Sequence, residues 1–215
     1  MMPIQGSAGV SPAPGLRAVL LLAAVLLFAG CGPLFQFRTS SAIEQNRLGR
    51  ALSANADNVH AHYLMGQAKL DENQTYEAIR HFDEARRLKP EMEEAWNGAG
   101  IARLSGRHYR GAMALYNEMA QKFPQSATAR EGQAAAAFAR GRIGDCQKFA
   151  QEALRLRSES PQALRLLGET SYALGEYDAA INYWDRAIQA DPSLANGLAP
   201  VIKDLRMYQG RYGKK

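Results

Sequence analysis

Residues 59 to 194 form four consecutive blocks of 34 residues, and the same residue types return at the same places in each block. A small residue stands at the eighth place of every block: Gly66, Gly100, Ala134 and Gly168. Another stands at the twentieth place: Ala78, Ala112, Cys146 and Ala180. A fixed period of this length is the sequence signature of a helical repeat array. We therefore predict an all-α solenoid whose core continues from one repeat to the next.

The four-block pattern resembles the tetratricopeptide repeat (TPR), a helix-turn-helix unit. The fourth block matches that family best and has these residues at family positions: Leu164, Leu167, Gly168, Gly175, Tyr177, Ala180, Trp184, Ala187 and Pro192. The third block departs most from the pattern, at these residues: Arg130, Gln133, Ala150 and Ser158. The resemblance implies a right-handed α-solenoid of four TPR units, a fold that offers an extended binding surface.

Shorter segments flank the four repeats. We assign the chain from residue 41 as follows: an N-terminal half repeat (41–58), TPR 1 (59–92), TPR 2 (93–126), a degenerate TPR 3 (127–160), TPR 4 (161–194), and a capping helix with a basic tail (195–215). The last segment has an apolar helix face made of Leu198, Val201, Ile202 and Leu205. We expect Pro200 in the first turn of that helix, where a missing N–H is tolerated, and Gly210 at its end.

The first 40 residues predict export and anchoring. Arg17 precedes an apolar run, Ala18 to Ala29, that is too short for a membrane span of about 20 residues. The ending Phe28-Ala29-Gly30-Cys31 resembles a bacterial lipobox, which implies a lipoprotein signal over residues 1–30 and lipidation of Cys31. A plain signal peptide and a short uncleaved anchor are the alternatives. Residues 31–40 would then be a lipidated tether, and Gly32 after the cysteine, by resemblance to lipoprotein sorting, favours the outer membrane.

Composition and motifs argue against several functional classes. The net charge is only +5 and the charges are mixed along the chain, so no basic stripe predicts nucleic-acid binding. No His-Glu-x-x-His, paired-Cys or Gly-rich phosphate-loop motif occurs. We interpret Cys146 as a small buried residue, with a reactive thiol as the alternative, and His60 and His62 as solvated rather than metal-binding. The sequence predicts no enzyme activity, no cofactor, no metal and no small-molecule substrate.

The resemblance to TPR proteins also implies where a partner binds. The inner face of the array would carry these partner-binding residues: Tyr63, Gln67, Asn97, Ile101, Phe138, Arg165, Glu169 and Tyr172. The twelfth place of each block, occupied by Phe138 and Tyr172 in the last two, has a second interpretation as packing between repeats. The places that hold a partner's terminal carboxylate in chaperone-binding TPRs offer only Asn97 of the required type, so we expect no carboxylate clamp.

Together, a lipobox and a short repeat array resemble the TPR lipoproteins of type IV and tight-adherence (Flp) pilus assembly. That resemblance implies a membrane-anchored scaffold in the bacterial envelope, facing the periplasm, which binds a segment of an envelope protein in its concave groove. The partner would belong to a cell-surface machine such as a pilus or secretin. An adaptor for periplasmic peptidoglycan enzymes or for polysaccharide export is the alternative.

Overall fold

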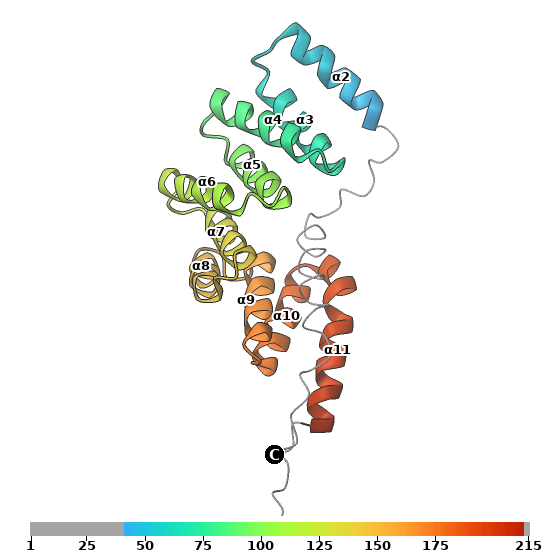
Figure 1. The fold of residues 1–215 in the computed structure, drawn as a ribbon, viewed down its shortest axis with the longest axis vertical. Helices are drawn as coiled ribbons and strands as arrows, with labels where there is room; N and C mark the ends of the chain where they lie inside the picture. The colour runs from blue at the N-terminus through green and yellow to red at the C-terminus, as the bar shows by residue number, and fades with distance from the viewer. Residues whose placement is uncertain (1–40, 213–215) are drawn as a thin grey trace, which may run out of the picture.

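The computed structural model describes residues 41–212, and all regular structure in that range is helical. The helices are α2 (Ser41–Ala54), α3 (Val59–Asp71), α4 (Thr75–Leu88), α5 (Glu93–Ser105), α6 (Tyr109–Lys122), α7 (Ala127–Ala139), α8 (Ile143–Leu156), α9 (Pro161–Ala173), α10 (Tyr177–Ala190), the short 3₁₀ helix η2 (Pro192–Leu194) and α11 (Ala195–Tyr212). Successive helix pairs stack along the longest axis of the molecule, between α2 at one end and α11 at the other (Figure 1). The fold is an all-α solenoid of TPR units with a half repeat before them and a capping helix after them.

Local sequence signals start the first helix of most repeats. The side chains of Asn58, Ser126 and Ser160 each accept a hydrogen bond from the backbone N–H three residues later, at 3.0, 2.9 and 3.1 Å. Each bond satisfies one N–H that the first turn of a helix leaves open. Met92 occupies the same place before α5 and makes no side-chain cap.

The turn inside each repeat uses a left-handed residue at the fifteenth place. The four residues and their φ values are Asn73 (59°), Arg107 (61°), Gly141 (71°) and Gly175 (80°). Gly106 ends α5 with a φ of −76°, and Gly144 lies inside α8. The first two repeats therefore place a side chain where glycine is the least strained residue.

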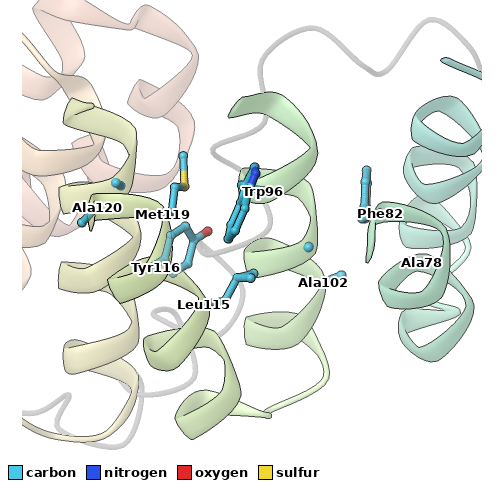
Figure 2. Packing of buried hydrophobic residues seen from close by; sticks show 10 residues of the cluster. Ala78, Phe82, Trp96, Ala102, Leu115, Tyr116, Met119 and Ala120 are labelled. Carbon is cyan, nitrogen blue, oxygen red and sulfur yellow. The ribbon is translucent and has the colours of Figure 1, made fainter. Parts of the chain in front are cut away.

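Aromatic rings at the twenty-fourth place hold neighbouring repeats together. The Phe82 ring lies between Gly66 of its own repeat and Gly98 of the next, where an added Cβ would approach it to 2.9 and 2.5 Å. An added Cβ at Gly132 would lie only 2.1 Å from the Tyr116 ring. Figure 2 shows Tyr116 and other members of its buried cluster between the helices. Glycine is required at these places because the ring contacts the helix backbone.

The degenerate third repeat keeps its core filled by an exchange of volumes. Its twenty-fourth place is Ala150, which is fully buried, and the eighth place is Ala134 instead of glycine. The sixth place of the next repeat, glycine at 98 and 132, is here Leu166, which packs in the same buried cluster as Ala150. A leucine entering from one side thus replaces an aromatic ring entering from the other, so the departure from the family pattern does not leave the core empty.

The capping helix is longer than the sequence predicted. Because η2 leads directly into it, α11 already begins at Ala195, and Pro200 lies inside the helix instead of in its first turn. Gly210 does not end the helix, which continues to Tyr212. Leu198, Ile202 and Leu205 are buried against α10 and η2, as the apolar face predicted, and this burial supports the helix despite the proline.

Candidate functional site

The first helices of the repeats form the inner wall of the stack. α3 contacts α5, α5 contacts α7, and α7 contacts α9, whereas the second helices make no comparable contacts with each other within residues 41–212. Helices that touch their next-but-one neighbours lie on the inside of a curved stack. All the partner-binding residues predicted within the repeats lie on these four first helices.

The inner wall is partly exposed over the first two repeats. Tyr63 packs its ring edge-on against Phe82 at 5.8 Å, and its hydroxyl accepts a hydrogen bond from Gln67 Nε2 at 3.0 Å. Asn97 Oδ1 accepts one from the Tyr116 hydroxyl at 3.1 Å. Ile101 is partly exposed and belongs to none of the buried clusters. This region therefore presents an apolar side chain among oriented polar groups, which is the usual composition of a recognition surface.

Two inner-wall side chains of the fourth repeat are buried. Arg165 and Glu169 are only 1% and 4% exposed, although the sequence predicted both on an open surface. Their side chains form an ion pair between Nη1 and Oε1. Arg165 Nη2 and Glu169 Oε2 are buried without a hydrogen-bond partner. Burial raises the pKa of the Glu169 carboxyl above its ordinary value, and the Arg165 charge opposes that shift.

Side chains at the twelfth place are half-buried and contribute to packing. Leu104 packs against two buried clusters that belong to successive repeats, and Phe138 packs against the second of these. Tyr172 lies 5.8 Å from the Trp184 ring and 5.7 Å from the Tyr177 ring, and burial raises the pKa of its hydroxyl. The packing interpretation therefore applies to this place, and the exposed edges of Phe138 and Tyr172 remain candidates for contact.

A histidine pair links the two helices of the first repeat. His62 is half-buried, not solvated as predicted, and its Nδ1 lies 3.0 Å from His81 Nδ1. When His62 is neutral, its Nε2–H donates to the carbonyl oxygen of Ala56 at 2.9 Å and its Nδ1 accepts from His81 Nδ1–H. The pKa of His81 is lowered to about 4, and burial is the largest cause. Nearby positive charges also lower it, and the largest of these contributions comes from His62 when it is protonated. The two histidines occupy the fourth and twenty-third places, which hold Trp96 and Leu115 of one core cluster in the next repeat. That correspondence could have revealed the pair from the sequence.

The remaining chemical expectations have the following outcomes. Cys146 is fully buried, and burial raises its pKa to about 12, as expected of a small core residue and not of a reactive thiol. Among the described residues, no group of three or more metal-ligating side chains comes together. No helix between residues 41 and 212 combines the length and apolar character needed to cross a membrane. Cys31, the predicted signal and the tether lie outside the described residues.

Comparison with known proteins supports the TPR fold. The tetratricopeptide-repeat family model matches residues 63–127, and the model for subunit 3 of the anaphase-promoting complex (cyclosome) matches residues 105–187. The Arabidopsis thaliana protein named CTR9 homolog is 30% identical over 137 residues, which are 63% of this chain but only 13% of that relative.

Solved structures resemble most of the chain. A thermophilic TPR protein of Thermus thermophilus, TTC0263, superimposes with a TM-score of 0.66 at 14% identity, over 89% of this chain and 98% of that protein. Pseudomonas aeruginosa PilF superimposes with a TM-score of 0.62 at 16% identity, over 93% of this chain and 96% of PilF. At these identities the likeness establishes the fold alone, and folds of this repeat type are typically protein-interaction scaffolds.

Proposed function

We propose that this protein is a non-catalytic scaffold, anchored to the outer membrane through lipidated Cys31, that assists assembly of a cell-surface machine such as a pilus or secretin. Its inner wall binds one segment of an envelope protein. The anchor holds the repeats on the periplasmic side of the membrane, and the wall brings the partner to that surface.

One observation carries the binding part of this proposal. The first helices contact one another in order, and their exposed residues therefore form a continuous strip instead of separate patches. In the first two repeats this strip contains Tyr63, Gln67, Asn97 and Ile101, all partly exposed. An apolar anchor such as Ile101, flanked by amides that can bond a peptide backbone, suits a peptide segment of a partner protein.

The anchoring part rests on the N-terminal sequence. Arg17, the apolar run and the Phe28-Ala29-Gly30-Cys31 ending resemble a lipoprotein signal, and together with the repeats they resemble pilus-assembly lipoproteins. The structural likeness to PilF agrees with this proposal at the level of the fold only.

Ile101→Arg tests the binding surface. The substitution puts a long charged side chain on the strip, but it removes no contact from a buried cluster. Leu174→Arg is the matched control, because Leu174 is 53% exposed and lies in the turn after α9. Both variants should keep the parent's thermal midpoint. Affinity capture from detergent-solubilised envelopes, read by mass spectrometry, should lose the specific partner with Ile101→Arg only. Full capture by the folded Ile101→Arg protein would reject the strip as the binding surface.

A further inference from the structure

The ion pair in α9 is built differently from the ion-pair network around Asp83. Asp83 uses both carboxylate oxygens, since Oδ1 accepts from Arg86 Nε at 2.9 Å and Oδ2 from Arg103 Nη2 at 2.6 Å. Glu169 is more deeply buried than Asp83, yet only its Oε1 has a partner. A structural ion pair is expected to satisfy its buried atoms, as the Asp83 network does.

The unsatisfied atoms make this pair costly as a purely structural element. Leaving a buried charged group without its hydrogen bonds costs free energy, and well-packed apolar residues would cost less in the same space. Repeats one and two have Tyr63, Gln67, Asn97 and Ile101 at the two equivalent places, so the solenoid itself does not require an ion pair there. Arg165 Nη2 and Glu169 Oε2 therefore keep hydrogen-bonding capacity that a ligand could use.

We propose that Arg165 Nη2 and Glu169 Oε2 bind a neutral amide group of the partner segment, with Nη2 donating to the amide oxygen and Oε2 accepting from the amide N–H. This inference rests on the proposed function and names the chemistry that one end of the inner wall selects. A carboxylate would meet the Glu169 charge and a cation would meet the Arg165 charge, whereas an amide complements both atoms. The amide comes from an Asn or Gln side chain or from the N–H and C=O of the partner's main chain.

Aromatic residues form the surroundings of this site. The indole Nε1–H of Trp184 donates to the main-chain oxygen of Arg165 at 3.3 Å, and the Trp184 ring lies 5.8 Å from that of Tyr172. Tyr172 follows Glu169 by three residues, hence lies on the same face of α9, and is only half-buried. The low polarity around the pair strengthens the hydrogen bonds that the amide makes.

Three nearly isosteric probes test this selectivity: acetamide offers a donor and an acceptor, acetate only acceptors, and acetamidinium only donors. The chain has two tryptophans, so ¹H–¹⁵N NMR of the full-length protein in detergent gives two indole signals. Trp184 reports on the site. Trp96, whose indole donates to Pro90 O in another repeat, is the internal control. We expect acetamide to shift the Trp184 signal saturably, at a concentration at least about tenfold lower than acetate or acetamidinium, and to leave Trp96 unchanged.

The double variant Arg165→Met/Glu169→Leu is the matched control, because it replaces both charges with apolar side chains of similar size and should stay folded. It should lose the acetamide response while its thermal midpoint stays near that of the parent. The peptides Ac-Ala-Gln-Ala-NH₂ and Ac-Ala-Leu-Ala-NH₂ distinguish the sources: a stronger response to the first assigns a side-chain amide, and equal responses assign the main chain.

This experiment uses no envelope component, so it can succeed where partner capture fails and can fail where capture succeeds. The proposal predicts an acetamide-selective shift of Trp184 that the double variant abolishes. An equal response to all three probes, no response of Trp184, or a response that survives in the double variant would overturn it.

Discussion

Replacing Gly132 by alanine should lower the free energy of unfolding, although alanine is the better helix former. The added Cβ would lie 2.1 Å from the Tyr116 ring. The ring cannot shift away, because its other side packs closely against Gly100, where an added Cβ would also lie only 2.3 Å from the ring. Its hydroxyl is in addition hydrogen-bonded to Asn97. Forcing a methyl group into a filled core costs about 3 kcal/mol, and helix propensity returns about 1 kcal/mol. We expect a net loss of about 2 kcal/mol.

Urea unfolding followed by circular dichroism measures this loss, and Gly49→Ala is the matched control. Gly49 lies in the middle of α2 with no atom within 4 Å of an added Cβ, so alanine there should stabilise by about 0.5–1 kcal/mol. In a Tyr116→Ala background the Gly132→Ala change fills vacated space and should stabilise too. The explanation fails if Gly132→Ala has the same sign with and without the Tyr116 ring.

The remaining predictions concern the turns, the histidine pair and the anchor. Arg107→Gly should raise the free energy of unfolding by about 1 kcal/mol in the same urea assay, because φ at this residue is 61°; no gain would mean that the turn is unstrained. The folded pKa of His81 is about 4, below its unfolded value, so the folded state binds fewer protons. The His81 contribution to the free energy of unfolding should be complete above about pH 6.5. It should fall by about 1–2 kcal/mol toward pH 4, a figure reduced to allow for the partial exposure of the side chain. His81→Gln should remove most of this pH dependence, and an unchanged pH dependence would exclude His81 as its source. Cys31→Ser should release the folded protein from the membrane fraction and abolish labelling by palmitate; a variant that still sediments with outer membranes, from a parent that takes up no palmitate, would contradict lipidation.

The repeat architecture was predictable because its signals are local and periodic. Small residues at the eighth and twentieth places lie where helices approach closely, and they recur every 34 residues even in the degenerate repeat, as Ala134 and Cys146. The volume exchange between Ala150 and Leu166 was missed because it breaks the period. The sequence does contain a second case of leucine at the sixth place following a residue without an aromatic ring at the twenty-fourth place. Repeat one has leucine at its sixth place, and the half repeat before it has Leu48 at its twenty-fourth place.

The candidate site was predictable only in its placement on the first helices. Family positions identify residues that point inward, but they do not show which of these are covered. Arg165 and Glu169 are buried in the fourth repeat, whereas Asn97 and Ile101 at the same two places of repeat two are partly exposed. Burial depends on the elements around a helix, and a helix period contains no information about them. The His62–His81 contact was missed for a related reason, since it joins two helices instead of two places on one.

Site-specific photocrosslinking in living cells tests the central claim most directly. A benzoyl-phenylalanine at position 101 lies on the exposed strip of the inner wall, and one at position 174 lies in an exposed turn. We predict that the residue at 101, but not that at 174, crosslinks the protein to one defined envelope protein, and that the crosslinked species is found in the outer-membrane fraction. Crosslinking from position 174 alone, or a partner outside the envelope, would contradict the account.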